Sequence, residues 1–144
     1  MTEDSPDQIR ETIRAEARAI GFDAVGFAAA EAAPETGADL DAWLADGMQG
    51  DMGWMARTVE RRRHPRALWP EARSVIVLGT NYGPAGDPLA LLGAQDRGNV
   101  SVYAKGRDYH DLVKSRLKQL ARFIHERHAA EVKVFVDTAP VMEK

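Results

Sequence analysis

The stretch VKVFVDTAPVMEK, residues 132–144, decides how the rest of the chain is interpreted. Its first five residues alternate valine with lysine or phenylalanine, which predicts a strand that places the three valines on one face. The strand should end at about Val136 or Asp137, because aspartate has low strand propensity and Pro140 restricts the residue before it. Ligands bind at the carboxyl ends of strands in open α/β sheets, so Asp137 either faces a ligand or opens a turn through its side chain.

Working outward from this strand, helical and extended patterns alternate along the chain. A continuous apolar run at residues 73–79 is typical of a strand that is buried on both faces. The alternation predicts an α/β domain with helices packed on a mixed sheet. The predicted helices cover residues 6–20, 40–44 and 108–127, and the predicted strands cover residues 22–29, 73–79, 99–104 and 132–136.

The two longest predicted helices carry terminal signals. Ser5 and Gln8 stand at the spacing of a capping box, and Gly21 is suited to end the first helix. Asp108 and Asp111 form a similar start for the last helix, with an acid replacing the usual glutamate.

Two stretches are predicted to be loops. Residues 47–55, GMQGDMGWM, hold three glycines and three methionines around a tryptophan. They form either a packed loop with adaptable methionine contacts or a flexible lip over a large apolar ligand. Residues 81–98 are rich in glycine and proline and long for a compact domain, which is typical of a functional or mobile loop.

The densest charge in the chain is an arginine run at residues 57–66. Most of these side chains are expected to form a solvated helix face. One or two of them could bind phosphate or carboxylate, which the guanidinium group matches in geometry. If the protein binds RNA or a phosphate-bearing cofactor, this run is the first predicted contact surface.

A second polar stretch, KGRDYHD at residues 105–111, lies where a predicted strand meets a helix N-terminus. Helix N-termini attract anions, so this seam is either a ligand edge or a helix cap with exposed polar residues. The four histidines lack HExxH spacing, and no glycine pattern matches a GxGxxG or GxxxxGK[ST] loop.

Composition bounds the function further. The 144 residues have 44% hydrophobic and 28% charged side chains and a net charge of −3, which is typical of one globular domain and argues against nonspecific nucleic-acid binding. The chain has no cysteine, so these residues alone cannot form disulfides, thiolate nucleophiles or iron–sulfur sites. No apolar run approaches a membrane span and no signal peptide is evident, so we expect a cytoplasmic protein without a membrane partner.

Four blocks carry a resemblance to a known family. They are GDMGWM at 50–55, RRHPRALWPEARSVIVLGTNY at 62–82, SVYAKGRDYHDLVK at 101–114 and VKVFVDTAPVMEK at 132–144. Together they resemble the N-terminal part of epoxyqueuosine reductase, the cobalamin-dependent oxidoreductase of the last step of queuosine biosynthesis. The resemblance implies reduction of the epoxide of epoxyqueuosine in tRNA to the alkene of queuosine, with tRNA carrying epoxyqueuosine as the partner.

The resemblance also implies site residues. Asp137 corresponds to the proton donor over the cobalt face of the cofactor and therefore also binds the cofactor. Arg62 corresponds to an arginine that lies against cobalamin, and Ser101 to a residue that lines the corrinoid. No residue is expected to ligate a metal. Weaker suggestions from the block that contains Ser101 are Tyr103, Lys105 and Tyr109.

The chain departs from the family pattern in extent. The family continues into the rest of its cobalamin-binding domain, a ferredoxin-like segment with two 4Fe-4S iron–sulfur clusters, and helical repeats that help to bind tRNA. We therefore expect residues 1–144 to be the N-terminal part of the cobalamin-binding catalytic domain, a partial reductase domain that is inactive alone. Its electrons would come from a missing domain or an external donor.

Two alternative functions remain open at this point. The chain could be a stand-alone RNA-binding or protein-binding α/β module without catalysis, with Asp137 as a turn residue. It could also be a reductase of related architecture that uses flavin instead of cobalamin. Absorption spectra distinguish the two cofactors, and a pure binding module should take up neither.

Overall fold

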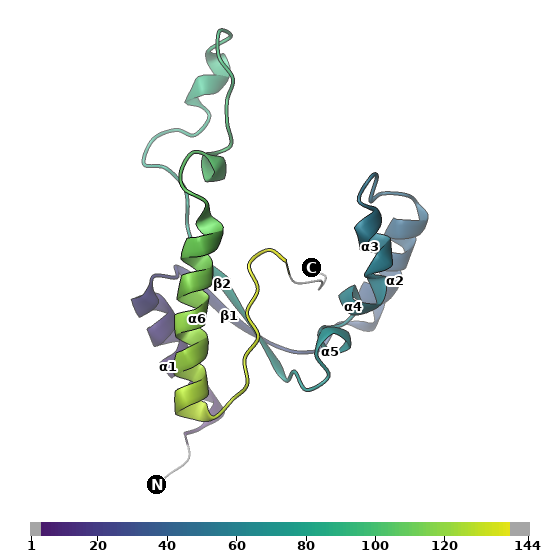
Figure 1. Ribbon diagram of the computed structural model, residues 1–144, viewed down its shortest axis with the longest axis vertical. Coiled ribbons are helices and arrows are strands. Elements are labelled where there is room, and N and C mark those ends of the chain that lie inside the picture. The colour runs from purple at the N-terminus through teal and green to yellow at the C-terminus, as the bar shows by residue number, and fades with distance from the viewer. Residues whose placement is uncertain (1–3, 139–144) are drawn as a thin grey trace. The chain divides into compact units, whose positions relative to one another are not determined.

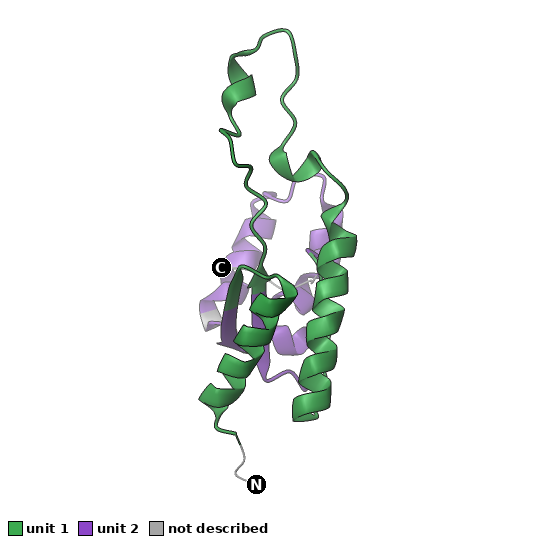
Figure 2. Ribbon diagram, turned by 90° about the vertical axis from the view of Figure 1, so that its left-hand side faces the viewer, with its two compact units in different colours: residues 1–25, 78–136 green, residues 26–77, 137–144 purple. Residues whose placement is uncertain are grey.

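The computed structural model describes residues 4–138, which contain helices and one small sheet (Figure 1). The chain divides into two compact units, shown in different colours in Figure 2. Unit 1 consists of Met1–Val25 and Leu78–Val136, and unit 2 consists of Gly26–Val77 and Asp137–Lys144. The predicted α/β fold class is confirmed.

Unit 1 is built on two helices that pack against each other, α1 (Pro6–Ile20) and α6 (Tyr109–His128) (Figure 1). Their facing stripes form its core, in which burial of apolar side chains supplies the main stabilisation. Arg116 of α6 adds a hydrogen bond of 2.9 Å from its Nη1 to the carbonyl oxygen of Gly21. The buried core residues of this unit are Ile13, Ala17, Phe22, Leu120 and Ile124.

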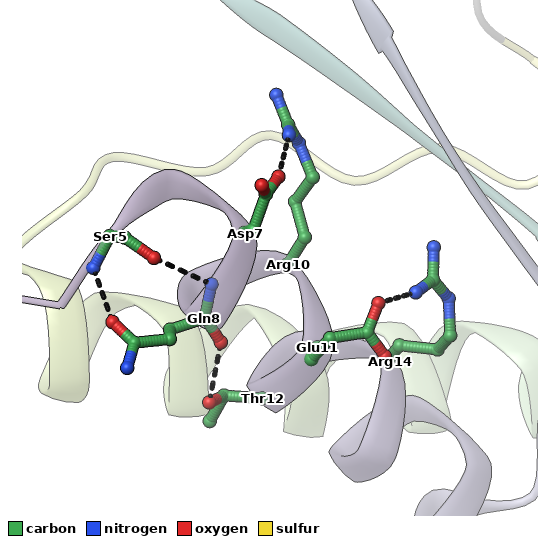
Figure 3. Close-up of polar contacts among 7 residues, drawn as sticks. All are labelled: Ser5, Asp7, Gln8, Arg10, Glu11, Thr12 and Arg14. Atoms are coloured by element: carbon green, nitrogen blue, oxygen red, sulfur yellow. Dashed lines mark hydrogen bonds and ion pairs between the residues drawn. The ribbon is translucent and has the colours of Figure 1, made fainter.

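The predicted capping box of α1 is present, and at the start of α6 the structure shows the Asp108 cap but not the Asp111 arm of the predicted pair. The Ser5 side chain accepts from the Gln8 backbone N–H at 3.3 Å, while the Ser5 N–H donates to Gln8 Oε1 at 2.7 Å (Figure 3). Gly21 adopts the left-handed conformation that ends α1, with φ 111°. At the start of α6, the Asp108 carboxylate accepts from the His110 backbone N–H at 2.9 Å. Local sequence signals therefore predict both helices correctly.

The sheet pairs β1 (Ala24–Ala29) with β2 (Ser74–Gly79). The pairing is antiparallel, because the N–H of Asp23 donates to the carbonyl of Gly79 and that of Ala30 to the carbonyl of Arg73. Both strands were predicted from sequence. The expected burial of β2 on both faces is wrong, since Val77 is 62% exposed. An apolar run indicates that a strand can be buried, but not how many layers cover it.

The described part of unit 2 contains a longer helix and three short ones. Arg63, which follows α4, pairs with Asp41 of α2 and links these two helices. The predicted loop at residues 47–55 is a series of turns whose last residues begin α3. The helices are α2 (Pro34–Ala45), α3 (Gly53–Arg57), α4 (Val59–Arg62) and α5 (Pro65–Leu68), and the buried core residues are Ala30 and Leu40.

Two predicted strands are wrong. Residues 99–104 contain a short 3-10 helix, η2 (Val102–Ala104), and residues 131–135 form no regular element. Alternation shows which side chains can share a face, but a strand exists only where its backbone groups pair with a neighbour. Within residues 4–138, the sheet has only β1 and β2, so neither segment has a ladder partner. The predicted influence of Pro140 lies outside the described residues.

The predicted loop at residues 81–98 is confirmed, with one 3-10 turn, η1 (Ala90–Gly93), inside it (Figure 1). Its apolar side chains lie at the surface: Tyr82, Leu89 and Leu92 are exposed. No helix of the described chain combines the length and the apolar character that crossing a membrane requires.

Candidate functional site

The three predicted site residues lie in different local structures. Arg62 ends α4 in unit 2, Ser101 precedes η2 in unit 1, and Asp137 lies in a bend that follows the irregular segment at residues 131–135.

Arg62 is fixed by contacts within its own unit. Its Nε donates to Thr58 Oγ1 at 2.9 Å, and its guanidinium carbon lies 4.7 Å from the centroid of the Trp54 ring. The Thr58 hydroxyl in turn donates to the carbonyl oxygen of Trp54 at 2.9 Å. A cation over an aromatic face contributes about 0.5–1 kcal/mol at exposed sites. The Nη donors of this oriented side chain are the groups that can reach a ligand acceptor.

The spacing of residues in the sequence is a signal for this contact. Residues 54, 58 and 62 follow one another at intervals of four, so they share a face if the helix runs nearly continuously through α3 and α4. Trp54 remains 45% exposed, and Met48 and Met52, which precede it in the sequence, are also exposed. An exposed aromatic face with an oriented cation over it is suited to an apolar ligand with a polar edge.

Ser101 is exposed and has extended dihedral angles, φ −54° and ψ 141°. Its carbonyl accepts the N–H of Ala104 at 2.9 Å, which closes the turn of η2. Its hydroxyl makes no capping hydrogen bond to this turn. Ser101 therefore presents a small hydrogen-bonding group at the surface of unit 1.

The polar seam at residues 105–111 is organised around α6's first turn. Asp108 Oδ1 lies 2.7 Å from His110 Nδ1, and the His110 ring stacks on Tyr109 with centroids 4.3 Å apart. Tyr103, 57% exposed, meets the Tyr109 ring edge-on at 6.5 Å. Hydrogen bonds from the His110 backbone and then from its side chain hold the pKa of Asp108 below its usual value. The helix-cap interpretation of this seam is confirmed, and its ligand role stays a prediction.

Asp137 is exposed and adopts the left-handed region, with φ 55°. This conformation is uncommon for residues other than glycine, although aspartate adopts it more readily than most. Residues 136 and 137 form a bend at this point. The turn through the Asp137 side chain stays a prediction, because the backbone around Ala139 that it would bind lies outside the described residues. A backbone outlier at the position of a proposed acid is also compatible with a functional constraint.

The chemistry of these residues fits one of the two cofactor types that the family resemblance implies. Within unit 2, the Arg62 fork over the exposed Trp54 ring suits a corrinoid, which has a broad apolar ring with polar substituents. Within unit 1, the exposed Ser101 hydroxyl is a hydrogen-bonding group of the kind that such substituents accept. Iron–sulfur clusters do not fit, because the chain has no cysteine. Among residues 4–138, no group of three histidine, aspartate or glutamate side chains is placed to hold a metal ion.

Comparison with known proteins identifies the relatives of this chain. The family model described as Epoxyqueuosine reductase QueG, DUF1730, matches residues 62–138, a range that contains all three predicted site residues. An epoxyqueuosine reductase of Xanthomonas campestris pv. campestris is 40% identical over 96% of this chain and 40% of its own length. The chain therefore spans about two fifths of this relative.

Two solved structures share the fold. The epoxyqueuosine reductase of Streptococcus thermophilus matches with a TM-score of 0.74 at 24% identity, over 92% of this chain and 36% of its own. An epoxyqueuosine reductase crystallised with an epoxyqueuosine-modified tRNA-Tyr stem loop matches with a TM-score of 0.72 at 24% identity, over 94% of this chain and 36% of its own. Because the family model covers more than half of its residues, the chain belongs to the epoxyqueuosine reductase family.

Proposed function

We propose that this chain is part of an enzyme that reduces epoxyqueuosine to queuosine in tRNA. The observation that carries the proposal is the family match over residues 62–138. One solved relative was crystallised with an epoxyqueuosine-modified stem loop, which supports tRNA as the partner. The enzyme would act in the cytoplasm, where tRNA is modified.

The proposed cofactor is cobalamin. Arg62 would hold its polar edge through the Nη donors, which the contacts with Thr58 and Trp54 orient. Ser101 would add a hydrogen bond from its exposed hydroxyl. When bound, reduced cobalamin supplies the reducing equivalents of the reaction.

Asp137 is the proposed acid. Conversion of an epoxide to an alkene breaks two C–O bonds, consumes two electrons and two protons, and releases the oxygen as water. Asp137 would deliver one proton to the departing oxygen, whose negative charge must be neutralised as the bond breaks. An Asp137→Asn change should then lower the rate of epoxide reduction in a full-length relative while leaving tRNA affinity unchanged.

The electrons must enter from outside residues 1–144. Cluster ligation requires cysteine, which this chain lacks. We therefore propose that the electrons come either from iron–sulfur clusters held by polypeptide outside these residues or from an external electron donor. The 144 residues would supply the N-terminal part of the cobalamin-binding domain and would be inactive alone.

Anaerobic reconstitution tests the cofactor assignment. The chain is mixed with cobalamin or, in parallel, with flavin mononucleotide, and the protein peak from gel filtration is examined by absorption. Co-elution of cobalamin but not flavin supports the proposal. Retention of flavin would favour the flavin-dependent alternative, and retention of neither would favour a binding module without catalysis.

A further inference from the structure

Helix α6 is basic in a chain that is acidic overall. It carries five lysine and arginine residues against two acids, a net charge of +3 where the whole chain has −3. Helix α1 carries three of each and has no net charge. Two of its three arginines pair along the helix, Arg10 with Asp7 and Arg14 with Glu11 (Figure 3). Such pairing is usual for a solvated helix face, and α6 departs from it.

Three basic side chains of α6 form a row, which we call the cation row: Lys114, Lys118 and Arg122. All three are exposed, and their spacing of four residues places them on one flank of the helix. The structure records no hydrogen bond or ion pair between them and any of residues 4–138. His110 continues the row by one turn toward the N-terminus.

The opposite flank of α6 holds the helix in place. Leu120 and Ile124 are buried against α1, and Arg116 bonds to the carbonyl of Gly21. The cation row is therefore carried on a packed helix and does not contribute to the core. The eight-residue step from Lys114 to Arg122 spans about 12 Å of helix, a length that can follow a few successive phosphates of one nucleic-acid strand.

The arginine run at residues 57–66 is a weaker candidate for the same role, because three of its five arginines are engaged elsewhere. Arg62 contacts Thr58 and Trp54. Arg63 pairs with Asp41, and Arg66 donates to the carbonyl of Ala72 at 3.1 Å.

We propose that the cation row is a docking surface for the phosphate backbone of RNA. Closely spaced cations without acidic partners complement a polyanion, and they gain affinity by releasing its counterions. The identification of this RNA as the substrate tRNA rests on the proposed function. The contact with RNA phosphates is inferred from the cation row alone and does not depend on that function.

The test compares two double charge reversals. K114E/K118E alters the row, and R57E/R61E alters two exposed arginines of the arginine run, so each changes the net charge by the same amount. The probe is a fluorescein-labelled RNA stem-loop of anticodon-arm sequence, measured by anisotropy over a series of KCl concentrations. Circular dichroism verifies that both variants are folded.

We expect K114E/K118E to weaken RNA binding about tenfold and to lower the slope of log affinity against log salt by about 1.5. The control should stay within about twofold of the original chain, because its arginines lie outside the row. Equal losses in both variants would show an effect of net charge alone and overturn the inference. Absence of RNA binding by the original chain, or competition by polyglutamate as strong as by RNA, would also overturn it.

Cobalamin retention by the same proteins separates this inference from the proposed function. Loss of RNA binding in K114E/K118E with no cobalamin retained by the original chain would leave the docking surface standing and contradict the cofactor assignment. If the original chain retains cobalamin and the two variants bind RNA equally, the cofactor assignment would stand and the docking surface would be contradicted.

Discussion

The two most basic stretches of the chain use their charges differently. In the arginine run, Arg62, Arg63 and Arg66 bind to groups of their own unit. On α6, Lys114 and Lys118 extend from a helix whose other flank is packed on α1. The arginine run, although denser in charge, therefore mainly holds its own unit together. Charge density in a sequence does not by itself indicate a binding surface, because the outcome depends on which partners the fold brings near.

The largest expected effect comes from releasing the helix that carries the cation row. A Leu120→Ala change should lower the free energy of unfolding by about 2–4 kcal/mol, because it removes buried methyl groups and leaves a cavity. Leu112→Ala is the matched control on the same helix, since Leu112 is 52% exposed. Urea unfolding measures both. Equal stabilities of the two variants would contradict the packing of α6 on α1.

A smaller effect should distinguish the two basic stretches directly. Arg63→Ala removes the ion pair with Asp41 and should lower the free energy of unfolding by about 0.5–1 kcal/mol, a value limited by solvent screening. Lys118→Ala should change it by less, because Lys118 is exposed and outside the core. The same urea titration compares them. A larger loss for Lys118→Ala would mean that the cation row is structural.

The smallest effect concerns pH at the start of α6. The pKa of Asp108 is lowered by hydrogen bonds from His110, so its stabilising contribution is present above the unfolded pKa and is lost as pH falls through the folded one. We expect an Asp108→Asn chain to differ slightly from the original above about pH 4 and to converge with it in stronger acid. Acid titration of helical circular dichroism tests this. If the original chain and the Asp108→Asn chain still differed as much in strong acid, the charge of the Asp108 carboxylate would not contribute to stability.

The sequence predicted those features that depend on neighbouring residues. The Ser5 capping box, Gly21 at the end of α1 and the apolar stripe of α6 are local, and the structure has all of them. The strands predicted at residues 99–104 and 132–136 failed because backbone pairing depends on a distant partner that alternation cannot reveal.

The site was predictable to a different extent. Periodicity predicted Asp137 at the end of a strand, where the structure has an irregular segment, and only the family resemblance suggested roles for Arg62 and Ser101. The contact of Arg62 with Trp54 went unpredicted, because it requires the α3–α4 region to be helical where the glycines and methionines indicated a loop. The use of Arg63 to pair with Asp41, 22 residues earlier, depends on the tertiary fold.

The central claim is that Arg62 belongs to a cobalamin site, and one titration tests it most directly. Cobalamin affinity is measured by absorption for the original chain, for Arg62→Ala, and for Arg61→Ala, an exposed neighbour on the same short helix. We predict that cobalamin binds the original chain and Arg61→Ala about equally, and binds Arg62→Ala about tenfold more weakly, as expected for loss of a charged hydrogen bond. Equal affinity of all three, or no binding by any, would contradict the account.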